Sequence, residues 1–390
     1  MISVEEALAR VFDLCAPVGR ETVPLRAAAG RVLATAVTAR RDQPPFSASA
    51  MDGYAVRDAD CGEGASFDVV GTSAAGHGYF DTVGAGEAVR IFTGAPVPAG
   101  ADRVIIQEDV TRDGDRITLT EPLGAGTNIR ASGGDFSAGD TFAPTRRLTP
   151  QDVTLLAAMN IAQVEVYCRP EVAIIATGDE LVMPGEDPGP SQIIASNSFG
   201  LAAMVEAAGG IARMLPIAPD DPDGLRYVFS LAEGADMVVT IGGASVGDHD
   251  IVGKVAEELG LDRAFYKIAM RPGKPLMAGR LGEAVMLGLP GNPVSAMVTG
   301  QLFMLPALAV LSGLAAATAP TLTAVLTQDI SENGPREHYM RARLSGNEIA
   351  PFERQDSSLM SILSDANALL KRPPFDRARK AGETVDYVPF

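Results

Sequence analysis

Hydrophobic residues in the middle of the chain form short continuous runs that alternate with longer segments of helical periodicity. Runs such as EVAIIA at 171–176 and MVVTI at 237–241 are almost wholly apolar and rich in β-branched residues. Strands without a polar face, separated by helices, are typical of a mostly parallel, doubly wound sheet with helices on both sides. We therefore expect an α/β domain over residues 171–314.

The pattern changes on both sides of this region. Residues 46–142 and 315–390 contain short apolar runs broken by Gly, Pro and Asp, which predict a small β-rich module and a separate C-terminal β domain. Helical periodicity is found outside the α/β region at Val4–Cys15, Leu25–Ala36 and Leu148–Ile161. Because helical segments precede and follow the β-rich module, we expect it to be inserted into a helical or linker domain formed by 1–45 and 143–170. The predicted fold class is multidomain α/β plus β.

Composition and charge narrow the function classes. The chain has a net charge of −17 and no Trp, and aromatic residues make up 5% of it. An acidic protein repels nucleic acid and anionic lipid, and few rings are available to stack on bases. The three cysteines lack CxxC spacing, the first residues are charged rather than signal-like, and the apolar runs are broken by Gly or Pro before they reach bilayer length. We expect a cytoplasmic protein with neither a nucleic-acid nor a membrane partner.

Four loops of the predicted α/β domain carry most of the residues suited to chemistry. Each follows a predicted strand: ATGDEL at 176–181, APDDPDG at 218–224, IGGASVGDHD at 241–250 and GLPGNPVSA at 288–296. Ligands of such sheets bind beyond the carboxyl ends of the strands, so we expect these loops at one edge. Glycine amides and helix N-termini suit phosphate groups, and clustered carboxylates suit Mg²⁺. With Lys267, Arg271 and Lys274 nearby in the sequence, the set predicts a phosphorylated ligand bridged by a metal.

Each loop also has a simpler interpretation. TGDEL and GGASVG are ordinary strand-to-helix turns, APDDPDG resembles a helix cap, and PGNP resembles a turn that begins a helix. Arg271 and Lys274 taken alone are equally compatible with a solvated charge pair. The expected convergence of all four loops on one sheet edge favours the functional interpretation.

Seven motifs resemble a single family, in order, along most of the chain. They are SAMDGYAVR at 49–57, FTGAPVPAGAD at 92–102, ATGDEL, PDDP, GGASVGDHD, RPGKP and LPGNPVSA. The family is that of the molybdopterin molybdenumtransferases, which includes bacterial MoeA and the E domain of gephyrin. The resemblance implies four domains and a homodimer. It also implies that molybdate is inserted into the dithiolene of adenylylated molybdopterin, with Mg²⁺ assisting and AMP leaving.

The resemblance further implies roles for individual residues. The positions that match nucleotide and pterin binding are Thr177, Gly178, Asp179, Gly242, Gly243, Ser245, Arg271, Pro290, Gly291, Asn292 and Ser295. The positions that match the catalytic set are Asp52, Thr93, Asp135, Glu180, Asp220, Asp250, Lys267 and Lys274. Among them Glu180, Asp220 and Asp250 would hold Mg²⁺. In the family the β module of one subunit faces the α/β domain of the other, so Asp52 would act in trans. The adenylyltransferase and the acceptor molybdoenzymes are the further partners implied.

Two positions depart from the family pattern. Arg271 stands where family members usually have Lys, which keeps the charge but changes its geometry. The C-terminal serine motif reads Gln355-Asp356-Ser357-Ser358, so that Asp356 adds a negative charge beside Ser357. Ser357 and Arg341 are the expected molybdate contacts of the C-terminal domain.

Two other function classes remain open from the residues. One is a different enzyme on the same α/β domain, either an adenylyltransferase or a CinA-like nucleotide hydrolase, although neither requires the SAMDGYA module. The other is a non-enzymatic scaffold that carries the cofactor to a partner.

Overall fold

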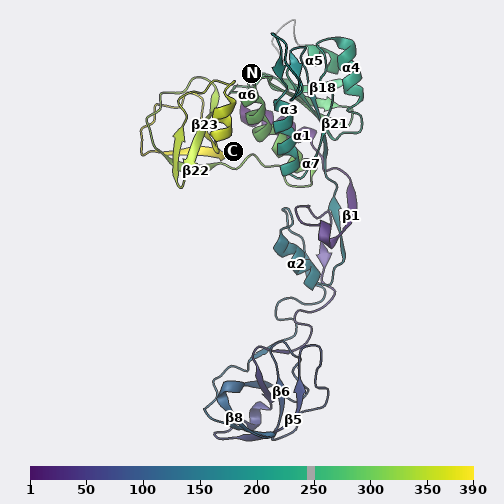
Figure 1. The fold of residues 1–390 in the computed structure, drawn as a ribbon, viewed down its shortest axis with the longest axis vertical. Helices are drawn as coiled ribbons and strands as arrows, with labels where there is room; N and C mark the ends of the chain where they lie inside the picture. Colours follow the sequence, from purple (N-terminus) through teal and green to yellow (C-terminus); the bar gives the residue numbers. More distant parts are fainter. Residues whose placement is uncertain (244–250) are drawn as a thin grey trace.

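The chain is drawn out along one axis, with a β-rich body at one end and the α/β and C-terminal parts side by side at the other (Figure 1). This computed structural model describes residues 1–243 and 251–390. A narrow segment joins the two ends (Figure 1). Among the described residues, those of the distant β-rich body therefore lie far from the α/β sheet of the same chain.

The α/β part is built on a six-stranded sheet of order β16-β13-β17-β21-β20-β18. The first four strands are parallel, and the last two run antiparallel to their neighbours. Their bounds are Ile211–Met214 (β16), Glu171–Ala176 (β13), Met237–Ile241 (β17), Ala284–Leu289 (β21), Met277–Leu281 (β20) and Leu261–Tyr266 (β18). Alternate residues of β13 pack into two different cores, Val172 and Ile174 on one face and Ala173 and Ile175 on the other. The predicted mostly parallel sheet with both faces covered is confirmed.

Helices cover both faces of this sheet. They are α3 (Asn197–Ala207), α4 (Pro222–Ser230), α5 (Ile251–Glu258), α6 (Pro293–Thr299) and α7 (Leu305–Leu311). A π-helical turn, Gly300–Met304, joins α6 to α7. Together these make a 19-residue apolar helix, long enough to cross a bilayer despite its Gly and Pro, so the length argument made from the sequence is wrong here. The helix is 78% buried inside the protein and packs as a core helix.

The first helix, α1 (Val4–Leu14), belongs to the α/β core. Ser3 caps it, its hydroxyl accepting from the Glu6 amide at 3.0 Å. Its buried residues Val4, Leu8 and Val11 lie in the same core as the sheet strands. The expectation that α1 packs with the linker segments is therefore corrected. It could not be settled from the sequence, because an apolar helix face can pack against any open sheet face.

The narrow segment is built from paired strands and one short helix. Three two-stranded ladders carry the chain outward and back: β1 (Arg20–Pro24) with β12 (Gln163–Tyr167), β2 (Val37–Thr38) with β11 (Thr141–Phe142), and β3 (Ala48–Ser49) with β10 (Ile129–Arg130). The helix is α2 (Pro150–Ala158), which has a capping box at Thr149 and Asp152. The helix predicted over Leu25–Ala36 is absent and only a 3-10 turn, Leu25–Ala27, forms there. Leu33 instead bridges Val166, so pairing with the returning strand overrides the local periodicity.

The distant body is a six-stranded sheet of order β7-β4-β6-β5-β9-β8. Its strands are β4 (Gly53–Val56), β5 (Ser66–Ser73), β6 (Glu87–Ile91), β7 (Arg103–Ile106), β8 (Val110–Asp113) and β9 (Arg116–Leu119). Short 3-10 turns lie at Asp58–Asp60 and Gln107–Asp109. Tyr54 and Val56 pack on one side of the sheet and Ala55 on the other, which gives the body two small cores.

The C-terminal part is a closed barrel. β23 pairs with β24, β24 with β22, β22 with β26, β26 with β25, and β25 again with β23. The bounds are Leu322–Leu326 (β22), Glu337–Ser345 (β23), Glu348–Pro351 (β24), Ala368–Arg372 (β25) and Thr384–Pro389 (β26), with a short helix α8 at Met360–Asp365. The strand β19 (Met270–Arg271) from the α/β part adds to β23 and joins the two parts.

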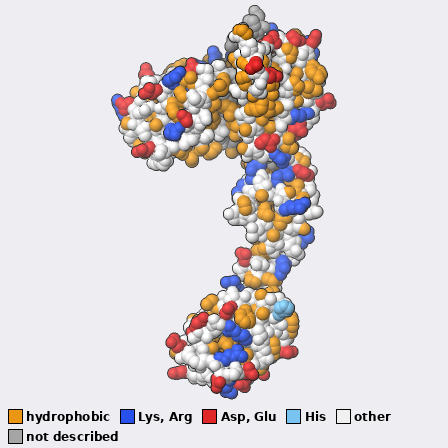
Figure 2. Space-filling model, viewed as in Figure 1, with side chains coloured by type: hydrophobic (Ala, Val, Ile, Leu, Met, Phe, Trp, Pro, Cys, Tyr) orange, Lys and Arg blue, Asp and Glu red, His pale blue; other side chains and the backbone are white. Residues whose placement is uncertain are grey.

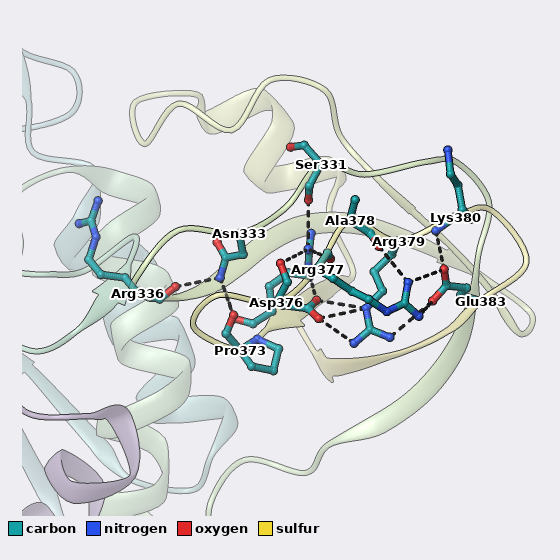
Figure 3. Close-up of polar contacts among 11 residues, drawn as sticks. Ser331, Asn333, Arg336, Pro373, Asp376, Arg377, Ala378, Arg379, Lys380 and Glu383 are labelled. Carbon is teal, nitrogen blue, oxygen red and sulfur yellow. Dashed lines mark hydrogen bonds and ion pairs between the residues drawn. The ribbon is translucent and has the colours of Figure 1, made fainter.

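A buried ion-pair network closes one end of this barrel (Figure 3). Its centre is Asp376, which receives Arg372 Nε at 2.5 Å and Arg379 NH2 at 2.7 Å. Arg372 also donates to the carbonyls of Ser331 and Arg377. The division of the whole chain into four domains, at the limits given above, stays a prediction.

Candidate functional site

A cavity of about 1290 Å³ opens at the carboxyl edge of the α/β sheet. Three of the four predicted loops contribute to it within the described residues, and the 241–250 loop does so through its first residues. The predicted site residues that line it are Thr177, Gly178, Glu180, Asp220, Gly242, Gly243, Pro290, Gly291 and Asn292. Ser245 and Asp250 lie outside the described residues. The convergence expected from the strand order thus extends to nine of the predicted positions.

The glycine loops are shaped by close backbone approach. Gly242 and Gly243 have φ values of +89° and +63°, a region in which L-residues with a side chain are strained. A Cβ on Gly243 would lie 2.1 Å from Val252 Cγ2 on α5. A Cβ on Gly291 would lie 3.5 Å from Gly242 Cα, so the two loops pass side by side. Side chains are thereby kept out of this wall, so the backbone itself forms the surface that a ligand would meet.

Two of the other loops bring carboxylates to the cavity, Glu180 from one and Asp220 from the other. The amide of Asp220 donates to Asp179 Oδ1 at 3.1 Å, and Glu180 folds back over Gly178. Burial raises the pKa of Asp220, and the charges of Asp179 and Glu180 raise it further. Among the described residues no group of three acids, histidines or cysteines is already arranged around a metal position. Glu180 and Asp220 both line the cavity, and one or two carboxylates together with substrate oxygens are a donor set that suits Mg²⁺.

Two polar cavity residues stand out among those that the sequence analysis did not predict. Asn197, at the start of α3, lines the cavity and its side-chain amide donates to the Gly291 carbonyl at 2.7 Å. Lys254, in the first turns of α5, also lines the cavity. A lysine on a helix is usually solvent-exposed, so the one signal in the sequence for its place in the cavity was its position shortly after the glycine-rich loop.

The predicted cations lie beside the cavity rather than on its wall. Of the RPGKP turn only Pro275 lines it. Lys267 stands at φ +71° with its ammonium 4.9 Å from the centre of the Tyr266 ring, and Arg271 sits in β19 at the junction with the barrel. Lys274 is exposed next to Pro275. Ser295 is 5% exposed and is absent from the cavity wall, so its place there is corrected.

The C-terminal serine motif reaches the cavity from the barrel. Ser358 lines it, whereas Ser357 contributes its carbonyl to the Val294 amide at the start of α6, at 3.1 Å. Arg341 is 1% exposed and its guanidinium donates to the carbonyls of Leu359, Arg354 and Asp356. In this structure Arg341 holds the serine loop in place, which differs from the direct molybdate contact expected for it.

The Asp356 carboxylate is hydrogen-bonded within its own loop. Its Oδ1 accepts from the Ser358 hydroxyl at 2.6 Å and from the Ser358 amide at 2.9 Å. These hydrogen bonds hold the pKa of Asp356 below its usual range. Asp356, the residue that departs from the family motif, therefore binds the hydroxyl of Ser358, which lines the cavity.

Asp52, Thr93 and Asp135 lie away from the cavity of their own chain. Asp52 and Thr93 form a pair on the distant β body, where the Thr93 amide and hydroxyl each donate to Asp52 Oδ1 at 2.7 Å. Both hydrogen bonds, the backbone one foremost, lower the pKa of Asp52. Asp135 lies exposed on a loop, and its backbone amide donates to the Gln43 carbonyl. Asp52, whose partner could not be identified in the sequence, thus has one on the neighbouring strand end.

The surface charge agrees with the composition. On the face shown in Figure 2, acidic and basic side chains are interspersed on the two ends, whereas basic side chains are more frequent than acidic ones on the narrow segment.

Comparisons with known proteins cover the whole chain. Three family models match: MoeA N-terminal region (domain I and II) at residues 2–160, a probable molybdopterin binding domain at 173–310, and MoeA C-terminal region (domain IV) at 323–390. A molybdopterin molybdenumtransferase of Haemophilus influenzae is 35% identical over 400 residues, covering 100% of this chain and 99% of the relative. One from Nostoc sp. is 38% identical over 331 residues, covering 82% of this chain and 76% of the relative.

A solved structure extends the likeness to the fold. The molybdopterin biosynthesis moeA protein from Pyrococcus horikoshii OT3 superposes with a TM-score of 0.86 at 29% identity, and all of both chains is covered. The match includes the N-terminal and C-terminal regions, which a protein sharing only the α/β domain would lack. The chain therefore belongs to the molybdopterin molybdenumtransferase family, transferases of molybdenum cofactor biosynthesis.

Proposed function

We propose that this chain binds adenylylated molybdopterin in the cavity at the sheet edge, inserts molybdenum from molybdate into its dithiolene, and releases AMP. The observation that carries this proposal is that two kinds of group line one cavity. They are the glycine loops around Gly242, Gly243 and Gly291, and the acids Glu180 and Asp220. A nucleotide with a phosphate bridge needs donors on one side and a cation held by carboxylates on the other.

The amide wall is suited to the anionic and polar groups of the substrate. Three described helices begin at the cavity: α3 near Asn197, α4 at Pro222 and α6 at Pro293. The positive end of each helix dipole favours a phosphate or another oxyanion. Lys254 adds a cation on the same side of the site.

The acidic wall would hold Mg²⁺ through Glu180 and Asp220, with Asp250 as a further proposed ligand. Bound there, the ion would offset the charge of the adenylate phosphates. Water would attack the phosphoanhydride and lose its proton to solvent, the phosphorus–oxygen bond to the pterin phosphate would break, and AMP would leave.

Molybdate would enter beside the RPGKP turn and the serine loop. Lys267, Arg271 and Lys274 would supply positive charge, and Ser357 and Ser358 would stand on the barrel side. Arg341 would act there by holding the loop. Because the exposed charges are screened by water, their contribution depends on closure around the substrate.

Asp52, Thr93 and Asp135 would complete the site from a second copy of the chain. The elongated shape supports this arrangement, since the β body of one chain is too distant to reach its own cavity (Figure 1). The acting form is then a homodimer in the cytoplasm. The adenylyltransferase would deliver the substrate and a molybdoenzyme would receive the product.

The test is AMP release from adenylylated molybdopterin by the purified chain, with Mg²⁺ and with or without molybdate. Strong dependence on molybdate supports the transferase. AMP incorporation from ATP would support an adenylyltransferase instead, release without molybdate would support a hydrolase, and binding without release would support a scaffold.

A further inference from the structure

Three strand ends meet beside Asp52 on the β body. β4 begins immediately after Asp52, β6 ends two residues before Thr93, and β7 ends immediately before Gln107. Thr93 donates to the Asp52 side chain, and the Gln107 amide donates to the Asp52 carbonyl at 3.1 Å. The position of the Asp52 carboxylate therefore depends on how these three ends are held together.

One side chain contacts all three ends. Arg90 NH1 donates to the carbonyl of Gly53 at 3.1 Å, and Arg90 NH2 donates to Gln107 Oε1 at 2.6 Å. The same guanidinium lies 4.9 Å from the ring centre of Phe92 and 5.0 Å from that of Tyr54. Arg90 thus touches the residue after Asp52, the residue before Thr93, and the residue that holds the Asp52 carbonyl.

The backbone already pairs these ends, Gly53 with Ile91 and with Ile106, and Arg90 adds side-chain contacts to that ladder. Gly53 cannot carry a side chain, because a Cβ there would lie 1.9 Å from the Ile105 carbonyl oxygen. The planar fork of arginine can donate in two directions while stacking on rings, which a lysine ammonium cannot do. Arg90 makes no hydrogen bond to the Asp52 carboxylate. Among the described residues nothing donates to Asp52 Oδ2, which leaves that oxygen open to a ligand.

We propose that Arg90 is a positioning residue of the reaction, which holds the Asp52–Thr93 pair in register so that Asp52 Oδ2 can engage the substrate or its metal. The inference rests on the proposed function of Asp52 in the transferase site. Arg90 itself touches neither substrate nor metal in this scheme. Its loss should lower turnover while leaving most substrate binding intact.

The test compares Arg90→Gln, Arg90→Lys and the control Arg116→Gln in the full chain. Arg116 pairs with Asp68 on the same sheet, is exposed, and stands apart from Asp52. We expect Arg90→Gln to lower kcat for molybdate-dependent AMP release by about 10- to 100-fold, with KM within about threefold. Arg90→Lys should recover only part of the rate. Arg116→Gln should match the wild type.

A readout independent of activity is the Thr93 amide, followed by NMR on selectively ¹⁵N-labelled threonine and assigned with Thr93→Ser. In the wild type its shift should titrate with Asp52. In Arg90→Gln the titration, and with it the acidic limb of the kcat profile, should move to higher pH, because a cation and two hydrogen bonds that favour the carboxylate are weakened.

The outcomes separate the two proposals. An unchanged Thr93 titration, or an unchanged kcat in a folded Arg90→Gln protein, overturns the positioning role of Arg90. Absence of AMP release in the wild type overturns the proposed function, and the Thr93 titration then still decides whether Arg90 positions the pair. Further loss of rate when Arg90→Gln is added to Asp52→Asn also contradicts the inference, since the effect would not pass through Asp52.

Discussion

The side-chain amide of Asn197 donates a 2.7 Å hydrogen bond to the carbonyl of Gly291, which ties the start of α3 to the glycine loop before α6. Both residues line the cavity, so the bond connects two parts of its wall. The prediction of the site from the sequence included Gly291 but not Asn197.

Asn197→Ala should therefore weaken substrate binding. A hydrogen bond of this kind contributes about 1 kcal/mol, so KM for adenylylated molybdopterin should rise by about fivefold with little change in kcat. Asn367→Ala is a matched control, because that amide also donates to a carbonyl, Leu344, but within the barrel. Steady-state AMP release measures both variants. Equal KM values for the two would mean that the Asn197 bond does not shape the site.

Asp220→Asn should raise thermal stability and abolish most activity. The folded-state pKa of Asp220 is raised by burial and by neighbouring acids. Its ionisation therefore opposes folding above its unfolded pKa, and this opposition fades as the pH falls. At neutral pH we expect Tm to rise by about 1–3 °C and AMP release to fall by about 100-fold or more.

Calorimetry with and without Mg²⁺ checks the same residue. The stability gain of Asp220→Asn should fade as the pH falls and vanish below the unfolded pKa of about 3.9, where the wild-type group is protonated in both the folded and the unfolded state. Mg²⁺ should raise the Tm of the wild type by binding the folded state, and should raise that of the variant less. A variant that is less stable at neutral pH would contradict the electrostatic explanation.

Mixed dimers test the trans site. A chain with Asp52→Asn and a chain with Glu180→Gln should each be inactive alone. If the two residues act on the same substrate from different subunits, random mixing should give about a quarter of the wild-type activity, because half of the dimers then contain one intact site. If each site is built within one chain, mixing restores no activity.

The network at Asp376 should matter for stability and not for chemistry (Figure 3). Asp376→Asn leaves Arg372, which is 3% exposed, without its carboxylate, and should cost about 3 kcal/mol of unfolding free energy. Asp329→Asn, which breaks an exposed pair with Lys380 in the same region, should change stability little. Urea unfolding measures both, and AMP release well below Tm should be unchanged in each.

The pH dependence of this network follows from the same contacts. Burial alone would raise the pKa of Asp376, but the hydrogen bonds from Arg379 and Arg372 hold it below its usual range. Its stabilising effect is therefore present above the unfolded pKa and is lost as the pH falls through the folded one. The free energy of unfolding of the wild type should accordingly fall more steeply than that of Asp376→Asn as the pH drops below about 4, the unfolded pKa of an ordinary aspartate. An equal pH dependence of the two proteins would contradict the network's role.

The parallel sheet and its loops could be predicted because buried strands are apolar on both faces and because strand order places their ends together. The family could be predicted because SAMDGYA and LPGNPVSA occur in one chain. What the sequence could not show were tertiary choices: which sheet face α1 covers, the pairing of Leu33 with Val166 in place of a helix, and the burial of Arg341 among carbonyls. These depend on contacts between segments remote in the sequence, where local periodicity carries no information.

The most direct test of the central claim is the ratio of molybdenum incorporated to AMP released. Wild-type chain, adenylylated molybdopterin, Mg²⁺ and molybdate are incubated, and pterin-bound molybdenum and free AMP are measured in the same samples over time. Insertion coupled to adenylate cleavage predicts one molybdenum for each AMP throughout, with both lost in Asp220→Asn. AMP that accumulates without pterin-bound molybdenum, or molybdenum bound without AMP, would contradict the account.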